Sequence, residues 1–532
     1  MRETVKPGGS LRLIPVVKSI ALTRDASEIF SLVSGGGHAP HAMFLESADI
    51  VPFYGKMSIM VIEPCLRICG RGTGYRLEAL DRFGIRFIDA LMPDLALLGS
   101  VIRNEPSLAE GILPPVPRHI DEQARLRAIT PFHVLRLVLG KLTPAYWPGH
   151  LFCGLFGALT YDFIDTFESL PPPLSDPLNE DDFTFYYGTT LLVADHAKHE
   201  LAIVSNAMVI TDEEAGGAFL HATEVIERIE RLILNGTAPP EAGSTGGAIT
   251  TSQEFSREEY MSLVETMKSH IVEGDVFQAV PSRTVTAEGI ADPWAIYREL
   301  RSLNPSPYMF YMNDGRGVLL GASPEMLLRV TGTEKPIVET RPIAGTRPRG
   351  IAAGVPDADL DSRYEVSLKT DFKELAEHSM LIDLARNDIA RVAKPGTRVV
   401  ESPYCTEKYS HVQHLVTTVK GELKEDIDAF HAYLSVMNAG TLTGAPKLKA
   451  MELLRRCEKF KRGYYGGACG YFSRNGEMDS CIIIRSMRIL EGKAHLRAGA
   501  GIVYDSIAES EYEETEKKLA APLTALKRAA ER

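Results

Sequence analysis

The chain has 532 residues, of which 45% are hydrophobic and 24% are charged. These fractions are typical of a soluble globular protein and exclude disordered, collagen-like and coiled-coil chains. At about 150 residues per domain, the length allows three or four domains or two large ones. The formal net charge of −12 argues against a nucleic-acid or anionic-membrane partner, although a local basic site could still bind a small anion.

The seven scattered cysteines predict neither a disulfide framework nor a zinc site. The N-terminal segment MRETVKPGGSLRLIPVV lacks the basic-then-apolar pattern of a signal peptide. No segment reaches the ~18 apolar residues that a membrane-spanning helix needs. We therefore expect a cytoplasmic protein with reduced thiols and no membrane partner.

In the N-terminal part of the chain, short runs of β-branched and apolar residues predict strands. These runs are MSIMVIEPCLRICG (57–70), YRLEAL (75–80) and FTFYYGTTLLVADHAKHELAIVSNAMVI (183–210). The third run is long enough for a hairpin or a meander, with HAKHE (196–200) as a turn. Residues 213–234 then show the apolar spacing of a helix.

One segment interrupts this pattern: residues 235–253 read NGTAPPEAGSTGGAITTSQ, which is small, polar and rich in Gly and Pro. Such a composition predicts an exposed connection. We therefore expect an N-terminal part over residues 1–235, a linker over 236–253 and a C-terminal part over 254–532.

Beyond the linker, the capping box formed by Ser256 and Glu259 begins a predicted helix, and Gly274 is suited to end it. Residues 276–287 and 317–330 predict further strands.

Two long helices are predicted near the end of the chain, over residues 371–392 and 510–530. Strands and helices follow one another without strict β-α-β alternation. This order predicts an α+β fold, with layered β-sheets flanked by helices, rather than a Rossmann fold or a TIM barrel.

Both of these helices carry a pair of glutamates at i and i+3, Glu374 with Glu377 and Glu511 with Glu514. Carboxylates at this spacing share one helix face and repel each other unless a cation lies between them. Two such faces could hold a hard divalent cation through oxygen ligands, with Mg²⁺ the first candidate. Solvated helix faces remain the alternative, and other glutamates nearby leave the choice of ligands open.

Three glycine-rich segments lie at 440–447, 463–472 and 498–506, and none of them has the order of a Walker A loop or a dinucleotide-binding turn. They can present backbone N–H groups to an anion or simply form tight turns. Arg485 follows an apolar run, where a guanidinium can clamp a substrate carboxylate or form a buried ion pair.

Several of these segments, taken in order, resemble the chorismate-utilising enzymes. The motifs that carry the resemblance are GASPE (321–325), PIAGTRPRG (342–350), DLDSR (359–363), KELAEHSMLIDLARNDIAR (373–391), GTLTGAPK (440–447), YGGACGYF (465–472), IIIRS (482–486) and AGAGIVYDS (498–506). FLESADI (44–50) and NPSPYMFYM (304–312) are typical, within this family, of the large subunits of anthranilate synthases. The resemblance covers almost the whole chain after about the first twenty residues.

Two positions separate the activities within the family. Water-adding members have a lysine where this chain has Gln278, and members that use a lysine nucleophile have it where this chain has Ala344. Glutamine cannot act as a base and alanine cannot act as a nucleophile. The resemblance therefore implies direct attack by ammonia.

The implied reaction adds ammonia to chorismate and then releases pyruvate to give anthranilate, the first step of tryptophan biosynthesis. The alternative is an aminodeoxyisochorismate synthase of secondary metabolism, which stops before pyruvate is lost. No G-x-C-x-G glutaminase elbow is present. A separate glutamine amidotransferase subunit is therefore expected to supply ammonia, in a hetero-tetramer.

The resemblance also implies a role for each matching residue. Mg²⁺ is bound by Glu377 and Glu514, with support from Glu374 and Glu511. The expected catalytic residues are Glu325, as the proton donor or acceptor at the leaving hydroxyl, His414 and Thr441. The substrate-binding residues are Gly345, Thr346, Tyr465, Arg485, Gly499, Ala500 and Gly501.

A feedback site for tryptophan is implied by the same resemblance, with the N-terminal part in a regulatory role. Its residues are Leu45, Glu46, Ser47, Pro307, Tyr308 and Met309. Serine and glutamate suit the polar end of an amino acid, and the other side chains suit an indole ring. Without the family, the FLESAD segment is only the end of a strand.

Overall fold

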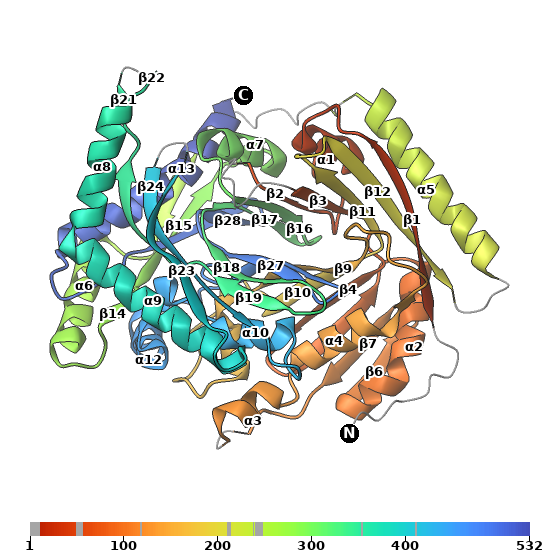
Figure 1. The fold of residues 1–532 in the computed structure, drawn as a ribbon, viewed down its shortest axis with the longest axis horizontal. Coiled ribbons are helices and arrows are strands. Elements are labelled where there is room, and N and C mark those ends of the chain that lie inside the picture. Colours follow the sequence, from red (N-terminus) through yellow and green to blue (C-terminus); the bar gives the residue numbers. More distant parts are fainter. Residues whose placement is uncertain are drawn as a thin grey trace.

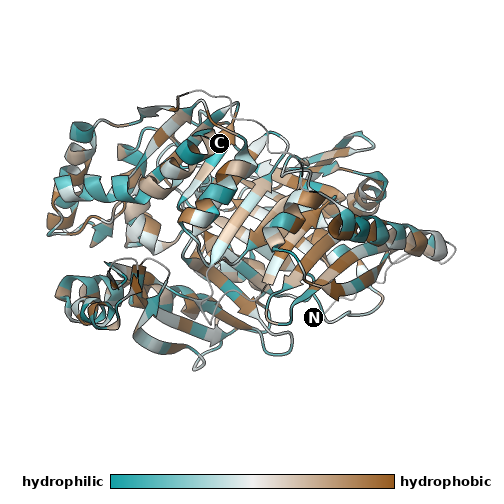
Figure 2. Ribbon diagram, turned by 90° about the horizontal axis from the view of Figure 1, so that it is seen from above, coloured by the Kyte–Doolittle hydropathy of each residue, from teal (hydrophilic) through white to brown (hydrophobic). Residues whose placement is uncertain are grey.

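The computed structural model describes residues 11–48, 57–117, 120–209, 214–237, 239, 248–352, 355–409 and 412–531. Within these residues, two large β-sheets lie against each other and helices cover the outside (Figure 1). Hydrophobic residues concentrate in the strands, whereas the peripheral helices are mostly hydrophilic (Figure 2). This arrangement confirms the predicted α+β class with layered sheets.

The first sheet has 12 strands in the described residues. Their order is β13 (Thr250–Gln253), β15 (Ser282–Glu288), β29 (Lys493–Gly499), β28 (Ser486–Leu490), β17 (Gly317–Ser323), β16 (Tyr308–Asn313), β2 (Met43–Glu46), β3 (Met57–Ile62), β11 (Thr190–Asp195), β12 (Glu200–Val209), β1 (Arg12–Ala21) and β8 (Thr143–Pro144).

The second sheet has 13 strands in the same part of the chain. Their order is β20 (Ile343–Pro348), β24 (Val412–Glu422), β19 (Ile337–Thr340), β18 (Met326–Thr331), β27 (Met478–Ile482), β26 (Ala468–Ser473), β9 (Gly154–Leu159), β10 (Phe183–Gly188), β4 (Leu66–Arg71), β5 (Gly74–Ala79), β7 (Leu108–Ile112) and β6 (Ser100–Glu105), while β23 (Val399–Lys408) pairs with β24. Two short pairs complete the strands: β14 (Gln278–Ala279) with β25 (Gly444–Ala445), and β21 (Ile351–Ala352) with β22 (Val355–Pro356).

Helices pack on both sheets. On the side of the first sheet lie α1 (Ala26–Val33), α5 (Ala215–Asn235), α6 (Arg257–Val272), α7 (Pro293–Leu303) and α13 (Ala508–Glu531). Around the second sheet lie α2 (Arg82–Leu98), α3 (Glu122–Arg127), α4 (Pro131–Lys141), the 3-10 helix η1 (Tyr161–Thr166), α8 (Ala358–Thr370), α9 (Phe372–Val392), α10 (Ala429–Val436), α11 (Gly440–Thr443) and α12 (Lys447–Cys457). No helix in the described ranges combines the length and the apolar character needed to cross a membrane.

Both parts of the chain contribute to both sheets. β2 of the N-terminal part pairs with β16 of the C-terminal part, and β9 pairs with β26. Much of the predicted linker, residues 238 and 240–247, lies outside the described residues. Its last four residues, Thr250–Gln253, form the edge strand β13 rather than a connection.

The structure has the four helices that local signals predicted, as α5, α6, α9 and α13, whereas α2, α4, α7, α8 and α12 were not predicted. Ser256 caps α6 through the predicted capping box, Gly274 follows the helix with a φ of +83°, and Asp371 caps α9. Four predicted strand runs prove to be divided, and one of them is 57–70, which forms β3 of the first sheet and β4 of the second. Within 183–210, β11 and β12 form the predicted hairpin, but β10 belongs to the other sheet, which makes the meander wrong.

The remaining two divided runs contain residues that lie at the candidate site described below. Residues 276–287 break at Pro281, which has no N–H to donate to a ladder, so β14 leaves the first sheet. Residues 317–330 cross from the first sheet to the second between β17 and β18. Glu325 lies at that crossing.

Candidate active site

Glu325 lies in the chain segment that connects β17 of the first sheet to β18 of the second. Its side chain is buried, and its Oε1 accepts a 3.0 Å hydrogen bond from the Thr441 hydroxyl, which α11 presents. Its backbone carbonyl accepts a hydrogen bond from Ile482 of β27. Burial raises the pKa of Glu325 to about 8, and Thr441 and Arg485 oppose that rise. The carboxyl group is therefore protonated at neutral pH and can donate a proton.

Arg485 lies in the turn between β27 and β28, with a backbone φ of +50°. Burial lowers the pKa of Arg485, whereas the nearby groups of Tyr465, Glu514 and Glu325 raise it. Burial raises the pKa of Tyr465 to about 12, so its hydroxyl stays neutral. A cation and a neutral hydroxyl donor therefore lie within each other's electrostatic field, and together they suit a carboxylate ligand.

The end of β29 passes close to these groups. A Cβ on Gly499 would lie 3.2 Å from the Tyr465 hydroxyl, and one on Gly501 would lie 2.7 Å from Gln278 Nε2. Glycine at these positions therefore leaves the space beside both side chains open. The structure differs from the prediction at Ala500, because its N–H already donates to the Pro281 carbonyl and its methyl group is buried in the core.

His414 of β24 lies beside Gly345 and Thr346 of the neighbouring strand β20. Its Nδ1 lies 2.8 Å from the Gly345 carbonyl and 3.1 Å from the exposed Thr346 hydroxyl. A carbonyl can only accept, so Nδ1 carries the proton and Nε2 is left as an acceptor. Burial lowers the pKa of His414 to about 4, and the ring is neutral at pH 7. Gly345 has a φ of +64°, and a Cβ there would lie 2.9 Å from Glu374 Oε2.

The four predicted metal-binding glutamates come from α9 and α13. Burial raises the pKa of Glu377, and the charges of Glu374 and Glu514 raise it further. Burial also raises the pKa of Glu511, with Glu514 again adding to the effect. The carboxylates of the two helices therefore lie within each other's electrostatic field, which fits a divalent cation between them.

Protein donors hold three of these carboxylates. Gln278 donates to Glu377 at 2.8 Å, Arg347 to Glu374 at 2.9 Å, and Lys518 to Glu514 at 2.7 Å. Burial tends to raise the pKa of Glu514, but Lys518 lowers it below the ordinary value.

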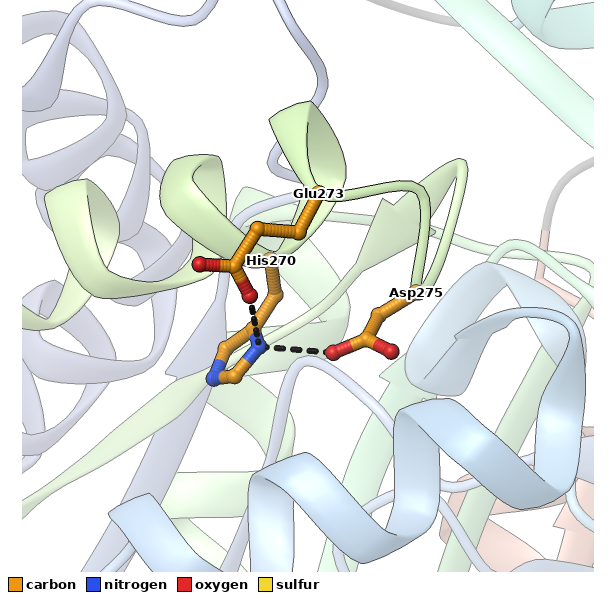
Figure 3. Close-up of side chains that lie close together, drawn as sticks. All are labelled: His270, Glu273 and Asp275. Carbon is orange, nitrogen blue, oxygen red and sulfur yellow. Dashed lines mark hydrogen bonds and ion pairs between the residues drawn. The ribbon is translucent and has the colours of Figure 1, made fainter.

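Elsewhere among the described residues, three possible metal ligands lie close together. His270, Glu273 and Asp275 have ligand atoms within 4.8 Å of one another at the end of α6 (Figure 3). His270 Nδ1 lies 2.9 Å from Asp275 and 3.8 Å from Glu273, and Asp275 also pairs with Lys449. These ion pairs explain the cluster without a metal.

A cavity of about 400 Å³ lies between the two sheets. All six residues predicted for the feedback site line it: Leu45, Glu46, Ser47, Pro307, Tyr308 and Met309. Its other wall comes from β18, β26 and β27. Residues 49–50 of the FLESADI motif lie outside the described residues.

The direction of Glu46 corrects one detail of that prediction. Its carboxylate accepts hydrogen bonds from the Tyr297 hydroxyl at 2.6 Å and from Arg301 Nε at 2.8 Å, both on α7. Glu46 pairs in register with Met309, whose side chain belongs to the core beneath α7. Its carboxylate is therefore engaged with α7 rather than free for a ligand's polar end.

Sequence reasoning missed two groups. Lys518 donates to both Glu514 and the Gly499 carbonyl at 2.7 Å, and its spacing of four residues from Glu514 on one helix was the available signal. In the cavity between the sheets, Asp479 accepts a hydrogen bond from the Tyr308 hydroxyl at 2.9 Å and pairs with Arg329. No local pattern marked this pair.

Comparison with known proteins agrees with this arrangement. Residues 117–524 match the family described as chorismate binding enzyme. The chain is 41% identical over 492 residues to anthranilate synthase component 1 of Escherichia coli, with 92% of each chain covered. It is 40% identical over 531 residues to anthranilate synthase component 1, pyocyanine specific, of Pseudomonas aeruginosa, covering 99% of this chain and 96% of the relative.

Solved structures show the same fold. Anthranilate synthase component I from Streptococcus pneumoniae aligns with a TM-score of 0.67 at 29% identity, covering 88% of this chain and 92% of that one. The menaquinone-specific isochorismate synthase of Escherichia coli aligns with a TM-score of 0.66 at 17% identity, covering 97% of this chain and 95% of that one, a likeness of fold alone. The fold expected from the resemblance is therefore confirmed.

Proposed function

Because the chain belongs to the chorismate binding enzyme family, we propose that it is the large component of an anthranilate synthase, a lyase that converts chorismate and ammonia to anthranilate and pyruvate. The observation that carries the proposal is the buried Glu325, which is protonated at neutral pH and faces a region with Arg485 and the Tyr465 hydroxyl. A cation beside a hydroxyl donor suits a substrate carboxylate, and a protonated carboxyl group suits a hydroxyl leaving group.

In the proposed reaction, Arg485 and Tyr465 bind a carboxylate of chorismate. Glu325 gives its proton to the C4 hydroxyl as that group leaves, while ammonia adds at C2. In the aminodeoxyisochorismate so formed, the C2 proton is lost and the methylene carbon of the enolpyruvyl group gains a proton as the C3–O bond breaks, which releases pyruvate and leaves the aromatic ring of anthranilate. His414 offers Nε2 as an acceptor on the other side of the site, and the open backbone at Gly499 and Gly501 leaves room for the ring.

The four glutamates of α9 and α13 are proposed to bind Mg²⁺, with Glu377 and Glu514 as ligands and Glu374 and Glu511 in support. When bound, Mg²⁺ would neutralise and anchor a substrate carboxylate. The mutual repulsion of these carboxylates, of which Glu511 is buried and the other three are partly buried, supports the assignment. Lys518 and Gln278 reduce that repulsion by holding one carboxylate each.

The regulatory proposal concerns the cavity between the sheets. We propose that it binds tryptophan as a feedback inhibitor, with Leu45, Ser47, Pro307 and Tyr308 against the ligand and Glu46 and Met309 as part of the supporting strands. Its volume of about 400 Å³ lies in the range of small-molecule sites. Because the cavity draws on both parts of the chain, the N-terminal part is regulatory only together with β16 and β18.

The partner proposal is a glutamine amidotransferase subunit in a cytoplasmic hetero-tetramer. Two relatives carry the name component 1, which supports a second component that delivers ammonia. The chain alone should then use ammonium but not glutamine. Size-exclusion chromatography with light scattering, with and without the partner, tests the assembly.

The deciding experiment mixes the purified protein with chorismate, ammonium and Mg²⁺ and separates the products by chromatography. Anthranilate and pyruvate in equal amounts support the proposal. Isochorismate or salicylate would reject it, and accumulated aminodeoxyisochorismate without pyruvate would favour the alternative synthase. Omitting ammonium is the control for a water-adding reaction.

A further inference from the structure

Arg283, near the start of β15, has no exposed surface at all. Its Nε donates to the Thr515 hydroxyl at 2.8 Å, and its guanidinium pairs with Glu516 and lies 4.6 Å from the ring centre of Tyr512. All three partners belong to one turn of α13. A single buried cation therefore contacts that turn through a hydrogen bond, an ion pair and a cation–π interaction.

A further donor of Arg283 reaches the neighbouring strand. Its Nη1 donates to Gln253 of β13 at 3.2 Å, and Gln253 accepts in turn from the Tyr512 hydroxyl at 3.3 Å. A buried guanidinium is costly unless its hydrogen bonds are satisfied. Because the partners on the helix and on the strand are complementary to one fork-shaped group, they favour one rotational position of α13.

The turn of α13 that Arg283 contacts also carries Glu514, and Glu511 lies one turn before Thr515. A roll of about 20° moves a group 5–6 Å from a helix axis by about 2 Å. Mg²⁺ demands near-octahedral oxygen ligands at about 2.0–2.1 Å, so a shift of that size would remove a ligand from its place. The rotational setting of α13 therefore decides whether its two carboxylates can share a cation with α9.

We propose that Arg283 is a positioning residue for the metal site: it sets the roll of α13 and thereby places Glu511 and Glu514 to bind a divalent cation. This inference rests on the proposed function, because it concerns the Mg²⁺ site of the same reaction. Arg283 is not a catalytic residue, since its donors are directed at α13 and β13.

The chain offers a matched control. Arg257 is exposed, pairs with Glu509 of α13 at 2.5 Å and lies 5.3 Å from the ring centre of the same Tyr512. It contacts α13 from the solvent side and lacks the buried hydrogen bond to Thr515. Replacing Arg257 therefore removes a surface ion pair and a cation–π contact, and we expect α13 to keep its rotational position about its own axis.

The test measures metal binding directly, with Mn²⁺ as a paramagnetic substitute titrated into the purified chain and the free ion followed by electron paramagnetic resonance. The signal that Glu377→Gln abolishes is assigned to the glutamate site. We expect Arg283→Gln to weaken this binding by about 10-fold or more, Arg283→Lys to weaken it less, and Arg257→Gln to leave it unchanged. Circular dichroism of each variant tests whether it is folded.

A purely structural role would lower the melting temperature of Arg283→Gln but leave the Mn²⁺ affinity of the folded protein within about twofold of the parent, and that result overturns the inference. If Arg283→Gln does not fold, Thr515→Val removes the acceptor of Nε with little change of volume. It should weaken binding by a smaller factor, and unchanged binding would again overturn the inference. If the parent shows no Glu377-dependent binding, the inference fails with the metal site, while the product assay still decides the reaction separately.

Discussion

The Thr441 hydroxyl donates a 3.0 Å hydrogen bond to Glu325 and is the foremost influence opposing the effect of burial on that carboxyl group. The two residues lie 116 positions apart in the chain. They meet because α11 reaches the crossing between β17 and β18. This contact links the protonation of the proposed acid to a residue that touches it directly.

Replacing Thr441 by valine should move the pH dependence of the reaction. The hydroxyl stabilises the ionised form of Glu325, so its loss raises the pKa of Glu325 further above about 8. The alkaline limb of kcat/KM should shift to higher pH, and kcat should fall because the acid is less well oriented. A pH profile from 6 to 10 measures the shift, and a limb that stays in place or moves to lower pH contradicts the assignment.

Glu325→Gln should lower kcat by about 10²–10⁴-fold, the usual worth of a general acid, and leave chorismate binding largely intact. Steady-state kinetics measure both quantities. Glu334→Gln, at an exposed position, is the matched control and should retain full activity. If Glu325→Gln kept more than about a tenth of the parent kcat, another group would have to donate the proton.

The same variant should be more stable than the parent at neutral pH. Burial raises the pKa of Glu325 from 4.5 to about 8 on folding, so the folded state binds more protons than the unfolded state between these values. The contribution of Glu325 to stability is thus fully present below pH 4.5 and is lost as the pH rises to 8. In thermal melts, the melting temperature of Glu325→Gln minus that of the parent should increase from pH 5 to pH 8. A difference that decreases with rising pH would contradict the raised pKa of Glu325.

Removing either proposed metal ligand should make activity depend on far more Mg²⁺. Glu377→Gln and Glu514→Gln leave an incomplete oxygen shell, so we expect a loss of about 10²-fold or more in kcat/KM at fixed Mg²⁺. Glu513→Gln changes an exposed neighbour on α13 and serves as the control. The parent should also gain thermal stability when Mg²⁺ is added, and both ligand variants should lose that gain.

Ser47→Arg should make the enzyme insensitive to tryptophan. The larger side chain occupies the cavity between the sheets, whereas Glu325 lies beyond it at the β17–β18 crossing. We expect the inhibitory concentration of tryptophan to rise by about tenfold or more with kcat nearly unchanged. Ser100→Arg places the same side chain on the edge strand β6 and is the control. Unchanged inhibition in Ser47→Arg would remove the cavity from the regulatory proposal.

Local sequence signals predicted several elements of the fold, whereas the residues of the candidate site were named by the resemblance to the family. The helix after Ser256 begins where its capping box predicted, the helix predicted over 371–392 is α9, and the i, i+3 spacing placed Glu374 with Glu377 on one face. These features depend on neighbours within one or two turns of helix. The motifs of the family then named side chains that the structure brings together.

Tertiary structure decided what depends on pairing between distant segments. Strand register turned the carboxylate of Glu46 toward Arg301, because successive side chains in a strand point to opposite faces. The crossing of β17 and β18 between sheets buried Glu325 and raised its pKa, and the contact of β15 with α13 enclosed Arg283. Burial and electrostatic environment arise only when elements far apart in the chain pack together, so no window of the sequence could contain them.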